Sequence, residues 1–156
     1  MNGKVEARLA SLGITLPDAP NPVANYVPTL ITGDLLFIAG QISKAADGTL
    51  AKGRLGAGLS VEEGQFAASL SALNILAQAK AALGELDRIK QVVKLGAFVN
   101  ATPEFVDHSQ VINGASDLMV KVLGDEIGRH TRAAVGVAGL PFGCAVEIDA
   151  IMQIEP

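Results

Sequence analysis

Residues 60–84, SVEEGQFAASLSALNILAQAKAALG, carry the clearest signal for the fold class of this chain. Ser60 and Glu63 form a capping-box pattern, in which each side chain bonds to the backbone amide of the other residue. Gly84 is a typical helix end, so the pattern predicts a helix over residues 61–83. The helix is rich in Ala and Ser, and such small side chains permit close approach to a β-sheet.

The next segments of the chain predict a strand and a second helix. Apolar residues occupy both alternating sets of positions over 90–99, which is typical of a strand covered on both faces. Thr102-Pro103-Glu104 combines a capping residue, a proline at the first helical position and an acid near the positive helix end. We therefore expect a second helix from Thr102 to about Leu123, ended by Gly124.

Two pairs of strands flank these helices. Residues 29–32 and 35–41 predict a hairpin around Gly33-Asp34, and 131–138 and 144–154 predict two strands joined by a Gly-Leu-Pro-Phe-Gly turn. The resulting order is strand-strand-helix-strand-helix-strand-strand. It favours an α+β fold, with one mixed sheet and both long helices on one face. The uncovered face is then the candidate subunit contact.

The remaining segments are an N-terminal extension and a long loop. Residues 2–12 predict a short amphipathic helix, and four prolines make 17–28 an extended segment. Residues 43–59 form a glycine-rich loop. No repeat or interdomain linker is evident, so the chain is expected to be a single domain over 1–156, with 1–16 as the extension.

Composition narrows the classes of partner. The chain is 49% hydrophobic and only 18% charged, which suggests apolar surface that an oligomer would cover. The net charge is −4 without any basic run, which argues against a nucleic-acid partner. Cys144 is the only cysteine, which excludes an internal disulfide and a zinc–thiolate site.

Neither a secretion signal nor a membrane span is expected. Residues 1–6 lack the basic-then-apolar layout of a signal peptide. The Ala-rich stretch 64–79 is too short for a span and contains Ser, Asn and Gln. A cytoplasmic location is the simplest expectation.

The main candidate site is an arginine and a glutamate near the C-terminus. Arg132 opens one strand, and a guanidinium binds a carboxylate through two parallel hydrogen bonds. Glu147 lies among Val and Ile residues, where burial would raise its pKa toward the range useful for acid–base catalysis. On neighbouring strands, the two would hold a small anionic substrate and move a proton. The alternatives are a surface arginine paired with an acid, and a solvated strand face bearing Glu147 and Asp149.

Other polar residues carry weaker signals. His108 and His130 do not form a metal motif, although His130 is close enough to the arginine to line the same pocket. Cys144 is expected to fill the core rather than act as a nucleophile. The loop 53–58 hints at a phosphate cradle but lacks the Gly-Lys-Ser/Thr ending. Tyr26 lies either at the edge of the hydrophobic core or in the wall of a pocket.

Several of these segments together resemble the Rid family, also called YjgF, of reactive-intermediate enamine and imine deaminases, in a longer subgroup. The resemblance spans about residues 20–154. Its most specific part is the spacing of TRAAVGV at 131–137, Leu140-Pro141 and VEIDAI at 146–151. The earlier parts are PNPVANYV at 20–27, FIAGQI at 37–42, and the helix that holds Asn113.

The resemblance implies a chorismate-mutase-like fold and a homotrimer with pockets between subunits. It implies hydrolysis of 2-aminoacrylate and other 2-imino acids to 2-keto acids and ammonia, which is a form of metabolite damage control. The family's carboxylate-binding arginine falls on Arg132 and its water-activating glutamate on Glu147. Its pocket tyrosine and asparagine fall on Tyr26 and Asn113, and backbone near Gly40 lines the site. No metal or cofactor is expected, because an imine carbon is already electrophilic.

One departure from the family pattern concerns the residue before Gly40-Gln41. The family often has Ser or Thr there, whereas this chain has Ala39, and the loop 43–59 is longer than in shorter members. A second hypothesis is therefore a small-carboxylate-binding or stress-related module that uses the same clefts without turnover. A third is the endoribonuclease, or translation inhibitor, of older family labels, which this acidic chain supports weakly.

Overall fold

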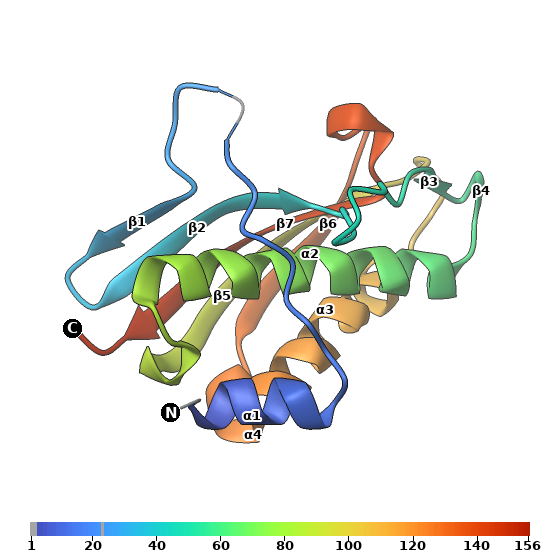
Figure 1. Cartoon of the computed structure of the whole chain (residues 1–156). Coiled ribbons are helices and arrows are strands. Elements are labelled where there is room, and N and C mark those ends of the chain that lie inside the picture. The colour runs from blue at the N-terminus through green and yellow to red at the C-terminus, as the bar shows by residue number, and fades with distance from the viewer. Residues whose placement is uncertain (1–2, 23) are drawn as a thin grey trace.

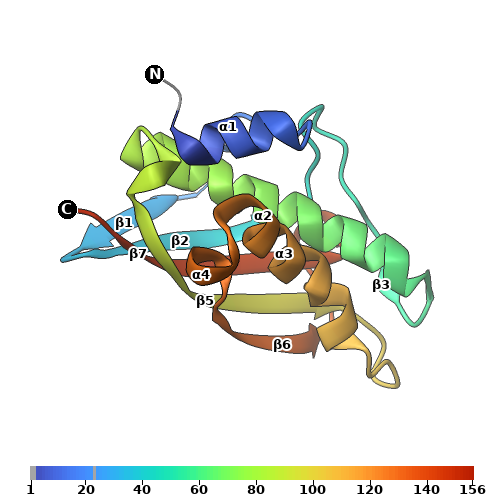
Figure 2. The same cartoon turned by 90° about the horizontal axis from the view of Figure 1, so that it is seen from below.

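The computed structural model describes residues 3–22 and 24–156, in which a five-stranded mixed sheet carries two long helices on one face (Figures 1 and 2). The strand order is β1-β2-β7-β5-β6. The strands are β1 (Thr29–Thr32), β2 (Leu35–Ile42), β5 (Ile89–Asn100), β6 (Thr131–Val137) and β7 (Val146–Ile154). The α+β prediction, with both long helices on one face of the sheet, is confirmed.

Helix α2 (Val61–Leu83) lies across the sheet with the bounds that its sequence predicts. The capping box is formed, since the Ser60 hydroxyl accepts from the Glu63 amide and the Glu63 carboxylate accepts from the Ser60 amide. Gly84 ends the helix at a φ of 83°, which favours glycine. By length and composition α2 could cross a membrane, but 67% of its most apolar window is buried inside the protein, as in a core helix.

Helix α3 (His108–Leu123) packs beside α2 and begins later than its sequence predicts. The expected start at Thr102 is wrong, because Thr102-Pro103-Glu104 forms a turn in which the Phe105 amide bonds to the Thr102 carbonyl. The Thr102 amide itself donates to the Leu55 carbonyl. This bond keeps the chain extended past the end of β5 and delays the helix to His108.

Short elements complete the chain. The N-terminal helix α1 (Lys4–Ser11) packs near α3 and the 3-10 turn η1 (Leu86–Arg88). The loop 43–59 contains two short paired strands, β3 (Arg54–Leu55) and β4 (Gly58–Leu59). A single-turn helix α4 (Asp125–Gly128) and a 3-10 turn η2 (Pro141–Gly143) lie before β6 and β7. The structure thus contains five short elements that the sequence did not predict, namely β3, β4, η1, α4 and η2.

The expectation that the last two strands are neighbours is wrong. β6 pairs in parallel with β5, and β7 pairs antiparallel with both β5 and β2, so β5 lies between β6 and β7. The physical reason is the helical crossover from β5 through α3, which returns the chain parallel to β5 at its free edge. The turn after β6 then carries the chain past β5 to its other side.

The two faces of the sheet differ in character. Alternate residues of β7, such as Val146, Ile148 and Ala150, are buried under the helices. Glu147, Asp149 and the residues paired with them point to the opposite face, which no helix covers in Figures 1 and 2. That open face exposes several large apolar side chains, namely Leu30, Phe37 and Val135.

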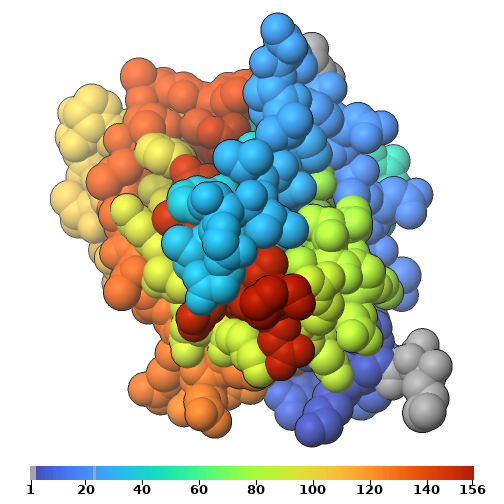
Figure 3. Space-filling model, turned by 90° about the vertical axis from the view of Figure 1, so that its left-hand side faces the viewer, coloured from blue at the N-terminus to red at the C-terminus, as the bar shows by residue number. Residues whose placement is uncertain are grey.

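The segment before β1 projects from the body of the protein. Figure 3 shows these residues above the β1–β2 hairpin, at the end of the molecule where the C-terminal residues also lie. Tyr26 and Val27 are 52% and 60% exposed there. The segment that carries Tyr26 is therefore largely open to solvent in the isolated chain.

Candidate functional site

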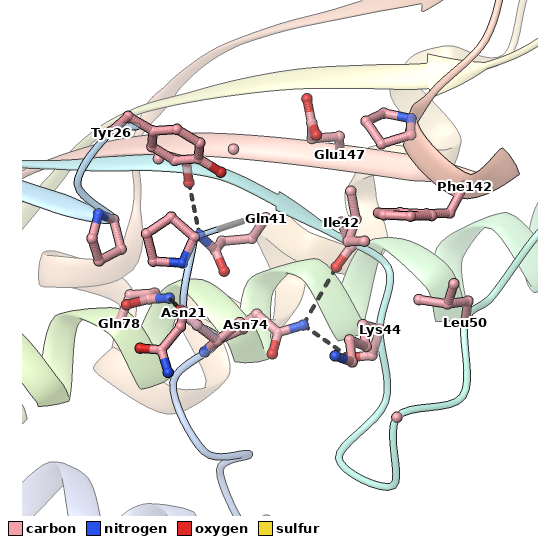
Figure 4. Close-up of a pocket in the computed structure, with 17 residues that line it drawn as sticks. Asn21, Tyr26, Gln41, Ile42, Lys44, Leu50, Asn74, Gln78, Phe142 and Glu147 are labelled. Atoms are coloured by element: carbon pink, nitrogen blue, oxygen red, sulfur yellow. Dashed lines mark hydrogen bonds between the residues drawn. The ribbon is translucent and has the colours of Figure 1, made fainter. Parts of the chain in front are cut away.

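A cavity of about 380 Å³ lies around the C-terminal end of β2 (Figure 4). Its walls come from the segment before β1, the end of β2, the loop after β2, helix α2 and the turn η2. Glu147 is the only acidic side chain among the described residues that line it. Most of the lining is apolar or uncharged, so one ionisable carboxyl faces a small, mainly neutral chamber.

Glu147 is placed by the alternation of β7 and by a glycine on the neighbouring strand. A Cβ atom built on Gly40 would lie 3.0 Å from the Glu147 Cδ, closer than ordinary van der Waals contact. Glycine at this position therefore leaves the room that the carboxyl occupies over β2. Half-burial raises the pKa of Glu147 above its ordinary value, and the Asp149 carboxylate on the same face raises it further.

Asp149 occupies an equivalent position over the next strand. Its carboxylate lies directly over Gly96 of β5, where a side chain would collide with it. Burial raises the pKa of Asp149, and the Gly96 amide and the Lys94 charge offset part of that rise. The open face thus carries two adjacent carboxyl groups, each fitted over a glycine of a neighbouring strand.

Tyr26, Ala39 and Gly40 line the same cavity as Glu147. Tyr26 comes from the projecting segment, and Figure 4 shows its ring on the side of β2 where the Glu147 carboxyl lies. The Ala39 amide donates to the Pro28 carbonyl and so ties that segment to β2. Ala39 brings a methyl group and no hydroxyl to the wall.

Arg132 lies outside this cavity, in a second cluster between β6 and α3. Its Nη1 donates to Asn113 Oδ1 at 2.9 Å and to Ser116 Oγ at 3.0 Å, and its Nη2 donates to the Ser109 carbonyl at 3.1 Å. Within residues 3–22 and 24–156, no carboxylate lies within 4.0 Å of the guanidinium. Neutral oxygens therefore orient the cation without neutralising its charge.

His130 belongs to the same cluster through a shared hydroxyl. Its Nε2 lies 2.8 Å from Ser116 Oγ, and its Nδ1 lies 2.6 Å from the Gly128 carbonyl. Because a carbonyl only accepts, Nδ1 carries the proton, and Nε2 of a neutral ring can then accept from the Ser116 hydroxyl. The chain of bonds from Arg132 through Ser116 to His130 fixes the orientation of all three side chains.

The structure thus divides the predicted site residues into two groups. Tyr26, Ala39, Gly40 and Glu147 line the cavity, whereas Asn113, His130 and Arg132 form the cluster at α3. Arg132 pairs with Leu95, whose buried side chain faces the helices, while Glu147 points to the open face. The two groups therefore lie on opposite sides of the sheet within one chain.

The sequence reasoning did not identify several polar residues of the cavity. Asn74 and Gln78 come from α2, where each is only 3% exposed in an otherwise Ala- and Leu-rich helix. Their spacing of four places them on one helix face, and a polar pair at this spacing in an apolar helix is the sequence signal that could have identified them. Phe142 was also missed: it holds a φ of 58°, which a bulky residue rarely adopts, and lines the cavity from η2.

The weaker candidates have structural surroundings of their own. Cys144 is fully buried, and burial raises the pKa of its thiol. The 53–58 loop leads into the N-terminus of α2, where Glu62 and Glu63 add negative charge and the capping box already uses two amides. This arrangement disfavours a phosphate. No cluster of three or more metal-ligating side chains occurs among the described residues.

Comparison with known proteins gives one family match. Residues 6–150 match the family described as "YjgF/chorismate mutase-like, putative endoribonuclease". Protein TCP17 of Trypanosoma cruzi is 52% identical to this chain over 154 residues, covering 99% of this chain and 96% of that protein.

Solved structures give the same picture. The protein Atu1372 of Agrobacterium tumefaciens, whose function is described as unknown, is 51% identical, with a TM-score of 0.88 over 97% of this chain and 94% of that one. The Escherichia coli protein TdcF, solved with bound serine, is 25% identical, with a TM-score of 0.63 over 88% of this chain and 94% of that one.

Proposed function

The chain belongs to the YjgF/chorismate mutase-like family, and from this premise and the site geometry we propose that it hydrolyses small enamines and imines to 2-keto acids and ammonia. The substrate class is 2-aminoacrylate and other 2-imino acids. In this proposal Glu147 activates water and Arg132 holds the substrate carboxylate. The observation that carries the proposal is the single carboxyl of Glu147 in a mainly neutral cavity, beside Tyr26 and over Gly40.

Two copies of the chain contribute to one site in this proposal. Arg132 and Glu147 lie on opposite sides of the sheet, so one chain cannot present both to the same small molecule. A homotrimer, in which the open sheet face packs against neighbouring copies, brings the α3 cluster of one chain to the cavity of the next. The exposed Phe37 and Val135 of that face favour such packing, because association removes apolar surface from water.

The chemistry requires one water and one group that moves protons. The enamine first gains a proton from solvent at its terminal carbon and loses one from its nitrogen to become the imine. The Glu147 carboxylate then removes a proton from water as the oxygen attacks the imine carbon, and returns it to the nitrogen. Transfer of the hydroxyl proton of this tetrahedral intermediate to the nitrogen, again through Glu147, breaks the carbon–nitrogen bond, releases ammonia and leaves the 2-keto acid. A pKa raised by burial makes Glu147 a stronger base once it is ionised.

Arg132 is suited to the anchoring role by its hydrogen bonds. Three oxygens of α3 hold its guanidinium, and no acid competes for it among the described residues. A carboxylate placed against it gains a charge-assisted hydrogen bond of about 1.5–3 kcal/mol. The bound serine of the related TdcF supports recognition of a small amino-acid-like ligand in this family.

A binding module without turnover is the second candidate, and Ala39 favours it. The cavity lacks a hydroxyl at that position, so one potential contact to substrate or water is missing. This candidate predicts binding of small 2-keto acids, seen as a rise in melting temperature, without faster imine hydrolysis. The endoribonuclease of the family description is a weaker alternative, and it requires steeply salt-dependent RNA binding.

The test generates 2-imino acids in situ with an amino-acid oxidase and traps the remaining imine with semicarbazide. The wild-type protein should lower semicarbazone formation and accelerate keto-acid release. Arg132→Ala and Glu147→Gln should each lower kcat/KM by about a hundredfold or more. An absence of acceleration by the wild type, or full activity of Arg132→Ala, would overturn the proposal.

Matched control variants separate these roles from general charge effects. Arg129→Ala removes a neighbouring arginine that is exposed and paired with Asp125. Glu104→Gln neutralises an exposed carboxylate in the turn before α3. Both controls should retain wild-type turnover.

We place this activity in the cytoplasm, since the buried single thiol of Cys144 requires no oxidising compartment.

A further inference from the structure

The cavity continues past Glu147 to helix α2 on the other side of β2. Figure 4 shows the Glu147 carboxyl on one side of the β2 ribbon and the side chains of Asn74 and Gln78 on the other. Both amides line the cavity although each is only 3% exposed. The chamber thus has a second polar end, formed by carboxamides on a rigid helix.

Each carboxamide is held by its nitrogen. Asn74 Nδ2 donates to the Lys44 carbonyl at 2.8 Å and to the Ile42 carbonyl at 3.4 Å, and Gln78 Nε2 donates to the Pro20 carbonyl at 2.6 Å. The oxygens Oδ1 and Oε1 accept no hydrogen bond from the residues that the structure describes. Fixed nitrogens orient these oxygens, which remain available as acceptors for a ligand.

The cavity is larger than the simplest substrate requires. Its 380 Å³ corresponds to about a dozen water-sized groups of ~30 Å³ each, roughly twice the number of non-hydrogen atoms in 2-aminoacrylate. The surplus space extends toward the α2 end, where no acidic side chain is present among the described lining residues and Lys44 supplies a positive charge. Acceptor oxygens without an acid favour a neutral hydrogen-bond donor over an ammonium group.

We infer that Asn74 and Gln78 form a specificity subsite for the side chain of the 2-imino acid, and that it selects a neutral side chain ending in a hydrogen-bond donor, such as a carboxamide. This inference rests on the proposed function for the position of the reacting end. The subsite itself is defined by the cavity and by the two oriented amides. A glutamine-derived imine fits this description, whereas a thioether of similar length has no donor.

Calorimetric titration of the full-length wild-type protein with L-glutamine, L-methionine and L-glutamate, used as stable analogues, tests the subsite without turnover. L-glutamine should bind at least about tenfold more tightly than L-methionine, because the thioether cannot donate a hydrogen bond to the two amide oxygens of the subsite. It should also bind more tightly than L-glutamate, because a side-chain carboxylate cannot donate to the two amide oxygens and gains little from Lys44, which is exposed and screened by solvent. Undetectable binding of glutamine, equal binding of methionine, or tighter binding of glutamate would overturn the inference.

Two glutamine variants on the same helix localise the effect. Gln78→Met should lower the glutamine-to-methionine affinity ratio by at least about threefold, through loss of one of the two subsite acceptors. Gln65→Met is the matched control, because Gln65 also lies on α2 and donates to a backbone carbonyl, that of Gln110, outside the cavity. The control should keep the wild-type ratio, and an equal change in both variants would contradict the subsite.

The same substrates distinguish this inference from the proposed function. If glutamine binds selectively but no imine is hydrolysed, the subsite stands and the deaminase proposal fails. If the alanine-derived imine is hydrolysed but glutamine binds no better than methionine, the deaminase proposal stands and the subsite fails.

Discussion

The close fit between Gly40 and Glu147 predicts a loss of activity from one added methyl group. The Cβ of Gly40→Ala would lie 3.0 Å from Glu147 Cδ and 3.1 Å from Oε2, so the carboxyl must move by a few tenths of an ångström. Misplacement of a catalytic group by an ångström costs about a hundredfold, so for a shift of a few tenths we expect kcat/KM to fall by about threefold to tenfold. Gly40 does not have a positive φ, so the backbone itself accepts alanine.

The measurement combines the semicarbazide-coupled assay with thermal unfolding of the same samples. Gly139→Ala is the matched control, because no atom lies within 4 Å of its added Cβ and its φ is also not positive. We expect Gly139→Ala to match the wild type in both assays, and Gly40→Ala to lose activity with a change in unfolding free energy below about 1 kcal/mol. Full activity of Gly40→Ala, in a protein that Glu147→Gln inactivates, would show that turnover does not depend on the close fit of the carboxyl over Gly40.

Three further predictions concern pH and stability. Burial raises the pKa of Glu147, so its contribution to stability is complete below its ordinary pKa of 4.5 and is lost as pH rises through the raised pKa. Thermal unfolding over a pH series should therefore show that Glu147→Gln is more stable than the wild type only above this window. Ser60→Ala removes the cap of α2 and should cost about 1 kcal/mol in urea unfolding, whereas Ser69→Ala inside the helix should cost less. Leu76→Ala deletes a fully buried side chain and should cost about 3–5 kcal/mol, against little change for the exposed Val106→Ala.

Local sequence signals predicted the elements whose ends are set by local hydrogen bonds. The Ser60–Glu63 capping box and Gly84 defined α2 at both ends, because these bonds form within one turn of the helix. The N-cap of α3 was misplaced by five residues, from Thr102 to Asp107. The competing bond from the Thr102 amide to Leu55 joins segments that are far apart in the chain, and no local pattern indicates it.

The candidate residues show the same division. Arg132 and Glu147 could be identified from residue type and strand pattern, since a cation and a carboxylate in apolar strands are unusual. Their separation by β5 and their opposite faces could not be predicted, because strand order depends on the α3 crossover. The sequence did not assign Asn74 and Gln78 to the site, since it is the packing of α2 under β2 that brings them to the cavity.

The order and type of the main elements, the choice of Arg132 and Glu147 as candidate site residues, and the resemblance to one family could all be obtained from the amino-acid sequence. Alternation, capping and residue type act over a few residues, so they can be read along the chain. The placement of Arg132 and Glu147 on opposite faces of the sheet, and of Glu147 in one cavity with Asn74 and Gln78, became known from the three-dimensional packing. Those relations depend on contacts between segments remote in the chain, which the packing of the sheet and helices alone specifies.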